Sequence, residues 1–225
     1  MTKNNSVRSV SIHTVKAMTH GRYLVCRPST SVAAPILVGF HGYGEHADRL
    51  LSELRLIPGV DEWLLISIQG LHRFYSKSGQ HVVSSWMTRQ DRDSAIMDNL
   101  TYVNDVVGSV KEAHNTTDTL VYCGFSQGVA MAYRAAAHGN YPCQGVVALA
   151  GDIPPELKDE GEIKWPSILI GRGNADEWYT EDKMDADLEF FRSINVKPEI
   201  CCFNAGHEWT EDFQKSVGQF LRRTR

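Results

Sequence analysis

The feature that most constrains the fold is a junction at which an apolar segment passes into an alanine-rich one. Residues 119–133 read Thr-Leu-Val-Tyr-Cys-Gly-Phe-Ser-Gln-Gly-Val-Ala-Met-Ala-Tyr. Leu120–Cys123 is short, apolar and partly β-branched, which predicts a buried strand, and the residues after Gly128 predict a helix. A strand that enters a helix through Gly-Phe-Ser-Gln-Gly predicts a tight turn that exposes the Ser126 hydroxyl above a sheet. Glycines two residues before and after the serine fit that turn, because side chains there would collide with the neighbouring strand or helix.

The rest of the chain alternates between apolar strands and helices. Strands are expected at 36–40, 63–68, 120–123, 145–150, 167–171 and 199–203, and helices at 48–56, 91–114, 127–137, 182–194 and 210–222. Continuously apolar strands predict a mostly parallel sheet with helices on both faces, an α/β fold. Residues 10–15 and 23–26 are expected to form an antiparallel N-terminal hairpin. Residues 69–90 are expected to be a long irregular stretch.

Composition narrows the class of protein. With 225 residues, of which 42% are hydrophobic, the chain is expected to form one domain over residues 1–225. The net charge of −4 and the lack of a basic block argue against nucleic-acid binding, and no apolar run reaches the length of a membrane span. The polar amino terminus lacks a signal-peptide core, and five cysteines without metal-type spacing suggest free thiols, so we expect a cytoplasmic protein. Neither a metal nor an organic cofactor is implied, and no sequence feature predicts an oligomeric state.

A serine nucleophile needs a base and an acid that orients it. His207 is the favoured base, because it follows the last predicted strand and lies after Ser126 in the chain. Two aspartates follow predicted strands and could serve as the acid, Asp176 and Asp152, of which Asp176 is favoured. The oxyanion of a tetrahedral intermediate needs backbone donors. We expect them to be the N–H of Gln127 and the N–H of Tyr43, the latter in a glycine-rich loop after the first buried strand.

With these residues placed, the chain resembles the α/β-hydrolase superfamily, and within it the phospholipase/carboxylesterase family that includes acyl-protein thioesterases and lysophospholipases. The resemblance runs from the His41-Gly42-x-Gly44 loop through the Ser126 motif to Asp176 and Gly206-His207. It implies an α/β-hydrolase fold and the same oxyanion, nucleophile, acid and base positions. The chain departs from the family pattern at Tyr43, Glu45, Val129 and Asp152, so the resemblance predicts the catalytic class more firmly than the substrate.

The expected activity is hydrolysis of small carboxylic esters with short to medium acyl chains. The interval between Ser126 and Asp176 is already filled by predicted elements, so no cap domain is expected and the site should be open. Phe74, Trp86 and Trp178 are candidate pocket walls, and each could instead pack against the domain. The alternatives are an acyl thioesterase or lysophospholipase, an amide or C–C hydrolase with the same triad, and a non-catalytic binding protein of this fold.

Overall fold

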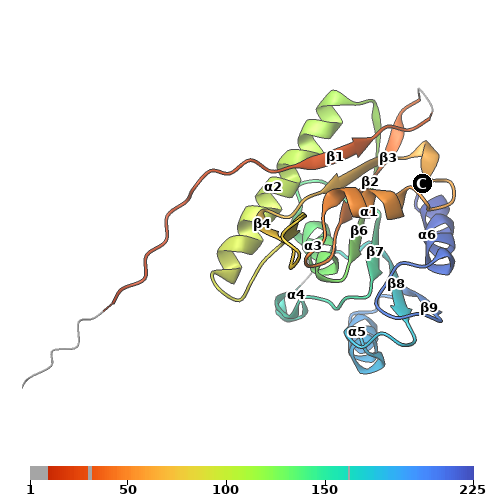
Figure 1. The fold of residues 1–225 in the computed structure, drawn as a ribbon. Helices are drawn as coiled ribbons and strands as arrows, with labels where there is room; N and C mark the ends of the chain where they lie inside the picture. Colours follow the sequence, from red (N-terminus) through yellow and green to blue (C-terminus); the bar gives the residue numbers. More distant parts are fainter. Residues whose placement is uncertain (1–9, 30–31, 162) are drawn as a thin grey trace, which may run out of the picture.

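A seven-stranded sheet forms the centre of the molecule. The computed structural model describes residues 10–29, 32–161 and 163–225. The strands lie in the order β1-β3-β2-β6-β7-β8-β9 (Figure 1). Their bounds are β1 Tyr23–Cys26, β2 Ala34–Phe40, β3 Leu64–Ile68, β6 Thr116–Phe125, β7 Gly145–Leu149, β8 Ser167–Gly173 and β9 Glu199–Phe203. All pairs are parallel except β1 with β3, so the carboxyl ends of β2, β3 and β6–β9 share one edge of the sheet.

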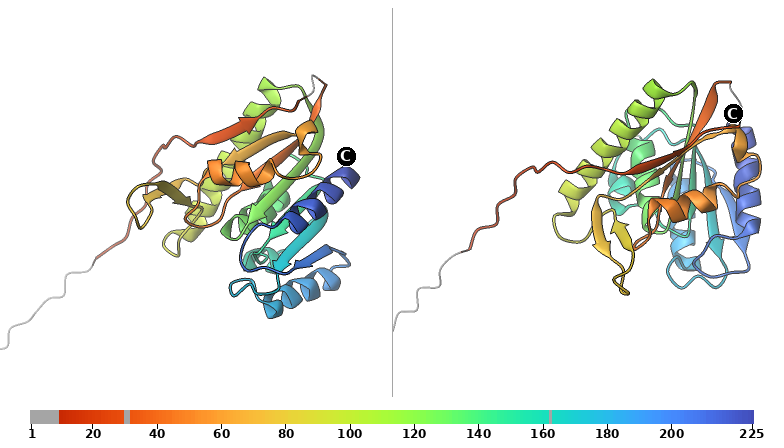
Figure 2. Two further views of the ribbon diagram at one scale, coloured as in Figure 1. Left: turned by 45° about the vertical axis from the view of Figure 1, so that its right-hand side comes forward. Right: turned by 45° about the horizontal axis from the view of Figure 1, so that its top comes forward.

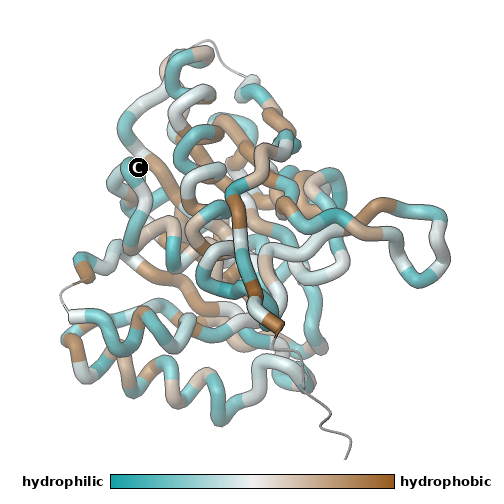
Figure 3. The backbone as a smooth tube through the Cα atoms, turned by 90° about the vertical axis from the view of Figure 1, so that its left-hand side faces the viewer, coloured by the Kyte–Doolittle hydropathy of each residue, from teal (hydrophilic) through white to brown (hydrophobic). Residues whose placement is uncertain are grey.

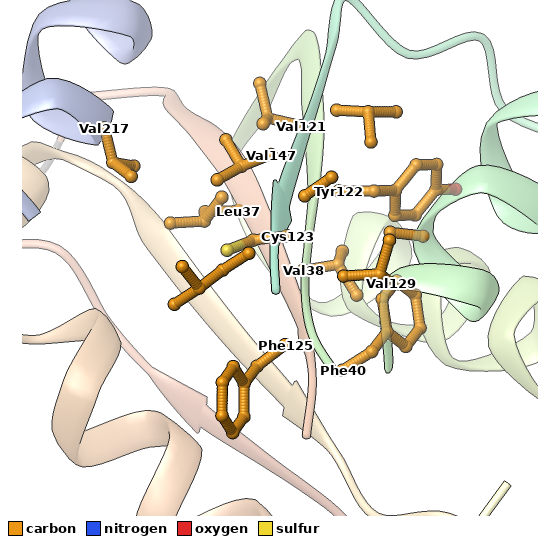
Figure 4. Packing of buried hydrophobic residues seen from close by; sticks show 14 of the residues in the cluster. Leu37, Val38, Phe40, Val121, Tyr122, Cys123, Phe125, Val129, Val147 and Val217 are labelled. Carbon is orange, nitrogen blue, oxygen red and sulfur yellow. The ribbon is translucent and has the colours of Figure 1, made fainter. Parts of the chain in front are cut away.

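The central strands are buried on both faces, as their continuous apolar sequences predict. Every residue of β2 is buried, and successive side chains point to opposite faces. Leu37 lies on the side of Val217, whereas Val38 lies on the side of Val129 (Figure 4). The hydropathy view shows apolar segments gathered in the middle of the molecule and mixed colours along the outer helices (Figure 3). The sheet therefore holds one apolar layer on each face.

Helices cover both faces of the sheet. They are α1 Ala47–Leu54, α2 Arg92–Ala113, α3 Gln127–His138, α4 Pro155–Asp159, α5 Glu181–Ser193 and α6 Glu211–Arg223, with a 3-10 turn at Val60–Glu62. Figure 2 shows α1 and α6 on one face, and α2 and α3 on the other. Local signals fix their ends: α6 begins where the Thr210 hydroxyl accepts the Phe213 N–H at 3.2 Å. No helix within the described ranges is long and apolar enough to cross a membrane.

A second, two-stranded sheet replaces the irregular stretch that was expected at residues 69–90. β4 (His72–Tyr75) and β5 (Val82–Ser85) pair antiparallel as a hairpin beside the main sheet (Figure 1). The prediction missed it because all four residues of β4 are exposed, so the strand shows no alternation between apolar and polar residues. This hairpin lies against the loop that follows β2, through a bridge between Ser84 and Glu45.

The amino-terminal part of the sheet also differs from the expectation. Residues 10–15 form no strand; they belong to an exposed, extended segment that runs away from the body (Figure 1). The antiparallel strand exists, but β1 finds its partner in β3, with Tyr23 opposite Ile68. The alternation of residues 10–15 does not by itself make a strand, because a strand needs a partner with free hydrogen-bonding groups. The buried strand β3 is that partner for β1.

Candidate active site

Ser126 lies at the turn between β6 and α3, in the backbone conformation that the sequence predicted. Its φ of 53° and ψ of −121° are unusual for a residue with a side chain. A Cβ at Gly124 would lie 2.4 Å from the Gly128 carbonyl oxygen, and one at Gly128 would lie 2.0 Å from the Phe40 carbonyl oxygen. Both positions therefore require glycine. The Ser126 N–H donates to the Leu149 carbonyl at 2.9 Å, which ties the strained turn to β7.

The structure brings Ser126, His207 and Asp176 into one hydrogen-bonded chain. His207 Nε2 lies 2.8 Å from Ser126 Oγ. On the other side of the ring, His207 Nδ1 lies 2.9 Å from Asp176 Oδ2 and 3.0 Å from Asp176 Oδ1. A carboxylate accepts hydrogen bonds, so Nδ1 carries the proton and Nε2 is left as the acceptor for the serine hydroxyl.

Two loops that follow neighbouring strands place the acid and the base. The loop after β8 donates its Asn174 N–H to the Phe203 carbonyl at 2.8 Å and its Ala175 N–H to the Ala205 carbonyl at 3.0 Å. A Cβ at Gly173 would lie 2.2 Å from the Gly206 carbonyl oxygen, so the two loops touch through backbone atoms. Because β8 and β9 are paired in parallel, the loops that follow them lie side by side and hold Asp176 and His207 at a fixed distance.

Asp176 is the better placed of the two candidate acids. Its carboxylate is buried and accepts the N–H of Trp178 at 2.8 Å and that of Tyr179 at 2.9 Å, in addition to His207. These donors fix the direction of the carboxylate. Asp152 is exposed, and no hydrogen bond within the described residues joins it to His207.

A second buried carboxylate, which the sequence analysis did not single out, supports the loop of Asp176. Asp187 of α5 accepts the Tyr179 hydroxyl at 3.0 Å, the Lys158 ammonium at 2.7 Å and the Ile153 N–H at 3.2 Å. Burial raises the pKa of Asp187, while Lys158 and the other donors oppose that rise. The aspartate within an otherwise polar helix gave no sequence signal, because only its partners distinguish it from exposed acidic neighbours.

The glycine-rich loop after β2 lies beside the serine turn. A Cβ at Gly42 would lie 3.1 Å from the Phe125 ring, and Gly44 adopts a φ of +71°. The Gly42 N–H donates to the Glu45 carboxylate at 2.9 Å. Within the described part of the chain, neither the N–H of Tyr43 nor that of Gln127 donates to an intramolecular acceptor. Both predicted oxyanion donors are therefore free to donate to a substrate oxygen.

His41 is a buried polar residue that the sequence analysis treated only as part of this loop. Its Nε2 accepts the Gly70 N–H at 3.0 Å and lies 2.9 Å from the Ser84 hydroxyl, so its proton is on Nδ1, which donates to the Gly42 carbonyl at 2.7 Å. Burial lowers the pKa of His41, partly offset by the Gly42 carbonyl. The imidazole is thus neutral and structural.

The three candidate pocket walls differ in exposure. Phe74, at 37% exposure, lies with its ring centroid 5.6 Å from that of Tyr43. Trp178 is 73% exposed, and its ring centroid lies 6.5 Å from that of His207. Trp86 was wrong as a pocket wall: it is fully buried, and its indole N–H donates to the His41 carbonyl at 2.8 Å. An indole in a polar stretch can enter the core because that carbonyl satisfies its single donor.

No group of three or more His, Cys, Asp and Glu side chains within the described ranges is arranged to hold a metal ion. The five cysteines are all free, and Cys123 is buried while Cys202 is exposed. The candidate site consists of the serine turn, the two loops at the ends of β8 and β9, and the loop after β2.

Comparisons with known proteins agree with this architecture. Residues 22–225 match the family model described as Phospholipase/Carboxylesterase. A search of the curated proteins gives no match. Among solved structures, esterase PE8 is similar with a TM-score of 0.74 at 17% identity, covering 92% of this chain and 100% of that chain. An acyl-protein thioesterase 2 from Zea mays gives a TM-score of 0.69 at 19% identity, covering 91% and 99%.

A carboxylesterase from Bacillus cereus is also similar, with a TM-score of 0.70 at 14% identity, covering 91% of this chain and 95% of that chain. At these identities the likeness carries the fold. The expected α/β-hydrolase fold is confirmed.

Proposed function

This chain belongs to the phospholipase/carboxylesterase family, and from that premise we propose that it is a serine hydrolase that cleaves small carboxylic esters through Ser126, His207 and Asp176. One observation carries the proposal: a serine hydroxyl on a strained turn lies 2.8 Å from an imidazole whose other nitrogen lies 2.9 Å from a buried carboxylate. A nucleophile, a base and an orienting acid in that order are what acyl transfer requires.

The first step is attack on the ester carbonyl. His207 Nε2 takes the Ser126 proton as Oγ bonds to the carbonyl carbon, and the carbonyl electron pair moves to the oxygen. Asp176 holds the proton on Nδ1 and stabilises the imidazolium that forms. The N–H groups of Tyr43 and Gln127 would receive the oxyanion, and each such donor typically contributes about 10²–10³ in rate.

The second step releases the alcohol. The tetrahedral intermediate collapses as the carbon–oxygen bond to the leaving group breaks, and the imidazolium of His207 gives its proton to that oxygen. Water, deprotonated by the same imidazole, then attacks the acyl carbon. The bond from that carbon to Ser126 Oγ breaks, the imidazolium returns its proton to Oγ, and the carboxylic acid leaves. Apart from the ester and one water molecule, these steps need only groups that the chain supplies.

The surroundings of the site support a small substrate that carries an aromatic group. Tyr43 is 63% exposed and lies against Phe74, and Trp178 lies near His207. Within the described residues, the interval between Ser126 and Asp176 holds only α3, β7, α4 and β8, so no inserted helices cover the serine. An ester with a short to medium acyl chain fits such an open site.

The test is labelling with a fluorophosphonate probe followed by peptide mapping. We expect stoichiometric modification of Ser126 in the native protein, and none in heat-denatured protein or in Ser126→Ala. Ser52→Ala, which removes an exposed serine of α1, is the matched control and should label normally. Labelling or turnover that persists in folded Ser126→Ala would overturn the proposal. Oxygen esters and thioesters of matched chain length then separate an esterase from a thioesterase.

A further inference from the structure

One short segment, residues 84–87 (Ser-Ser-Trp-Met), connects the loop after β2 with the serine turn. On one side it pairs with the loop: the Gly44 N–H donates to the Ser84 carbonyl at 3.0 Å, and the Ser84 N–H donates to the Glu45 carbonyl at 2.8 Å. These two bonds make an antiparallel bridge. The segment that carries Tyr43 is therefore an added edge of the β4–β5 hairpin.

On the other side, the segment is held by the side chain of Gln127. The Gln127 Oε1 accepts the Trp86 N–H at 3.0 Å, and its Nε2 donates to the Met87 carbonyl at 3.0 Å. The Ser85 hydroxyl lies between the same two groups, 3.2 Å from Gln127 Oε1 and 2.8 Å from the Met87 carbonyl. The amide thus contacts three successive residues. Because these contacts use the side chain alone, they leave the backbone N–H of Gln127 free for the oxyanion.

Buried polar groups fix the middle of the connection. The Ser84 hydroxyl accepts the Gln69 amide at 2.8 Å and lies 2.9 Å from His41 Nε2, to which it donates. The Trp86 indole donates to the His41 carbonyl at 2.8 Å. Ser84 and His41 are fully buried and Gln69 is 3% exposed. Water cannot replace these bonds, so the loop and the segment are expected to move together.

We propose that residues 84–87 fix the position of the two oxyanion donors, the N–H groups of Tyr43 and Gln127, relative to each other. Gln127 and Ser84 then act through their side chains as positioning residues for acyl transfer. The inference rests on the proposed function. Oxyanion donors work only when they lie about 2.7–3.1 Å from the developing charge, and a misplacement of about 1 Å costs about 10²-fold in rate. Loosening the segment should therefore affect the transition state more than substrate binding.

The test uses Gln127→Met, which keeps the length of the side chain and the backbone N–H but removes the clamp. Ser84→Ala is the second variant, which removes the hydroxyl between Gln69 and His41. Gln144→Met is the matched control: the Gln144 Oε1 accepts the Leu120 N–H at 2.7 Å, a glutamine side chain bonded to backbone in the middle of β6, away from the serine turn. The measurements are kcat and KM for a p-nitrophenyl ester, and the inhibition constant of an alkyl boronic acid, whose tetrahedral serine adduct places an oxygen at the oxyanion position.

We expect kcat to fall about 10–100-fold in Gln127→Met and Ser84→Ala, and the boronic acid to bind weaker by a similar factor, with KM within about threefold. Gln144→Met should keep both values while it lowers the melting temperature. A folded Gln127→Met or Ser84→Ala protein with kcat within twofold of the parent would overturn the inference. So would failure of both variants to fold, since the segment would then be a determinant of the fold alone. Ser126→Ala in the same assay keeps the two proposals apart, because its activity bears only on the triad.

Discussion

His207 Nδ1 lies 2.9 Å from Asp176 Oδ2, on a carboxylate that also accepts two backbone N–H groups. The hydrogen bond fixes which imidazole nitrogen carries the proton. It also links the ends of β8 and β9, so the geometry of the candidate site follows from the pairing of two neighbouring strands.

Asp176→Asn should leave the fold intact and lower kcat by about 10⁴-fold, because an amide can hold the imidazole in the wrong tautomer, with Nε2 protonated toward the serine. KM should change little. The measurement is steady-state hydrolysis of a p-nitrophenyl ester together with the rate of fluorophosphonate labelling. Asp152→Asn is the matched control and should behave as the parent. A large loss in Asp152→Asn with normal activity in Asp176→Asn would reverse the assignment of the acid.

Much of the candidate site could be predicted from the sequence because its signals are local. The turn at Ser126 is encoded by glycines two residues away on each side, and His207 lies in the short loop after the last strand, β9. The choice between Asp176 and Asp152 was less determined, since both follow parallel strands. In the structure, backbone bonds between the loops after β8 and β9 bring Asp176 within 2.9 Å of His207 Nδ1.

The features that the sequence did not predict depend on contacts between distant segments. The β4–β5 hairpin has an exposed first strand, so no apolar pattern marks it. For Trp86, the choice between a pocket wall and packing against the domain stayed open, because nothing in its neighbourhood shows that its indole N–H donates to the His41 carbonyl, 45 residues away in the chain. Buried polar pairs of this kind have no period in the sequence.

Gly128→Ala should destabilise the protein severely, by about 3 kcal/mol or more, because overpacking a rigid backbone contact cannot be relieved by a side-chain shift. The added Cβ would lie 2.0 Å from the Phe40 carbonyl oxygen. Denaturant unfolding measures the change. Gly161→Ala is the control, since nothing lies within 4 Å of a Cβ there. Equal stabilities for the two variants would contradict the close approach of α3 to β2.

Asp187→Ala should cost about 3 kcal/mol, the lower end of the range for breaking a buried ion pair, because Lys158 is 29% exposed and can reach solvent. The Tyr179 hydroxyl and the Ile153 N–H lose their acceptor at the same time. A loss of that size corresponds to a fall in melting temperature of roughly 6–12 °C for a chain of this length. Asp185→Ala, at an exposed position of the same helix, should change the melting temperature little. Similar values for both variants would show that Asp187 does not anchor the loop of Asp176.

The stability of the protein should fall as the pH drops below about 6.5, in part because of His41. Burial lowers its pKa from the ordinary value of 6.5, with Glu45 nearby opposing the shift and His46 adding to it. Between the lowered pKa and 6.5 the unfolded chain binds a proton that the folded protein does not, so unfolding is favoured by up to about 1.4 kcal/mol per pH unit. His41→Gln should show a shallower fall in the free energy of unfolding over this range, whereas the exposed His81→Gln should follow the parent. Parallel curves for parent and His41→Gln would contradict a buried, neutral imidazole.

Trp178→Ala tests whether the exposed indole beside His207 contacts the leaving group. Its ring centroid lies 6.5 Å from that of the imidazole that gives its proton to the leaving oxygen. An aromatic contact is worth about 0.5–1.5 kcal/mol, so we expect KM for an aryl ester to rise about 2–10-fold with kcat within twofold. An alkyl ester with the same acyl chain should respond less, because it offers no ring to the indole. Tyr75→Ala, which removes another exposed aromatic ring, is the control and should leave both esters unaffected. An equal rise in KM for aryl and alkyl esters would place the indole against the acyl chain instead.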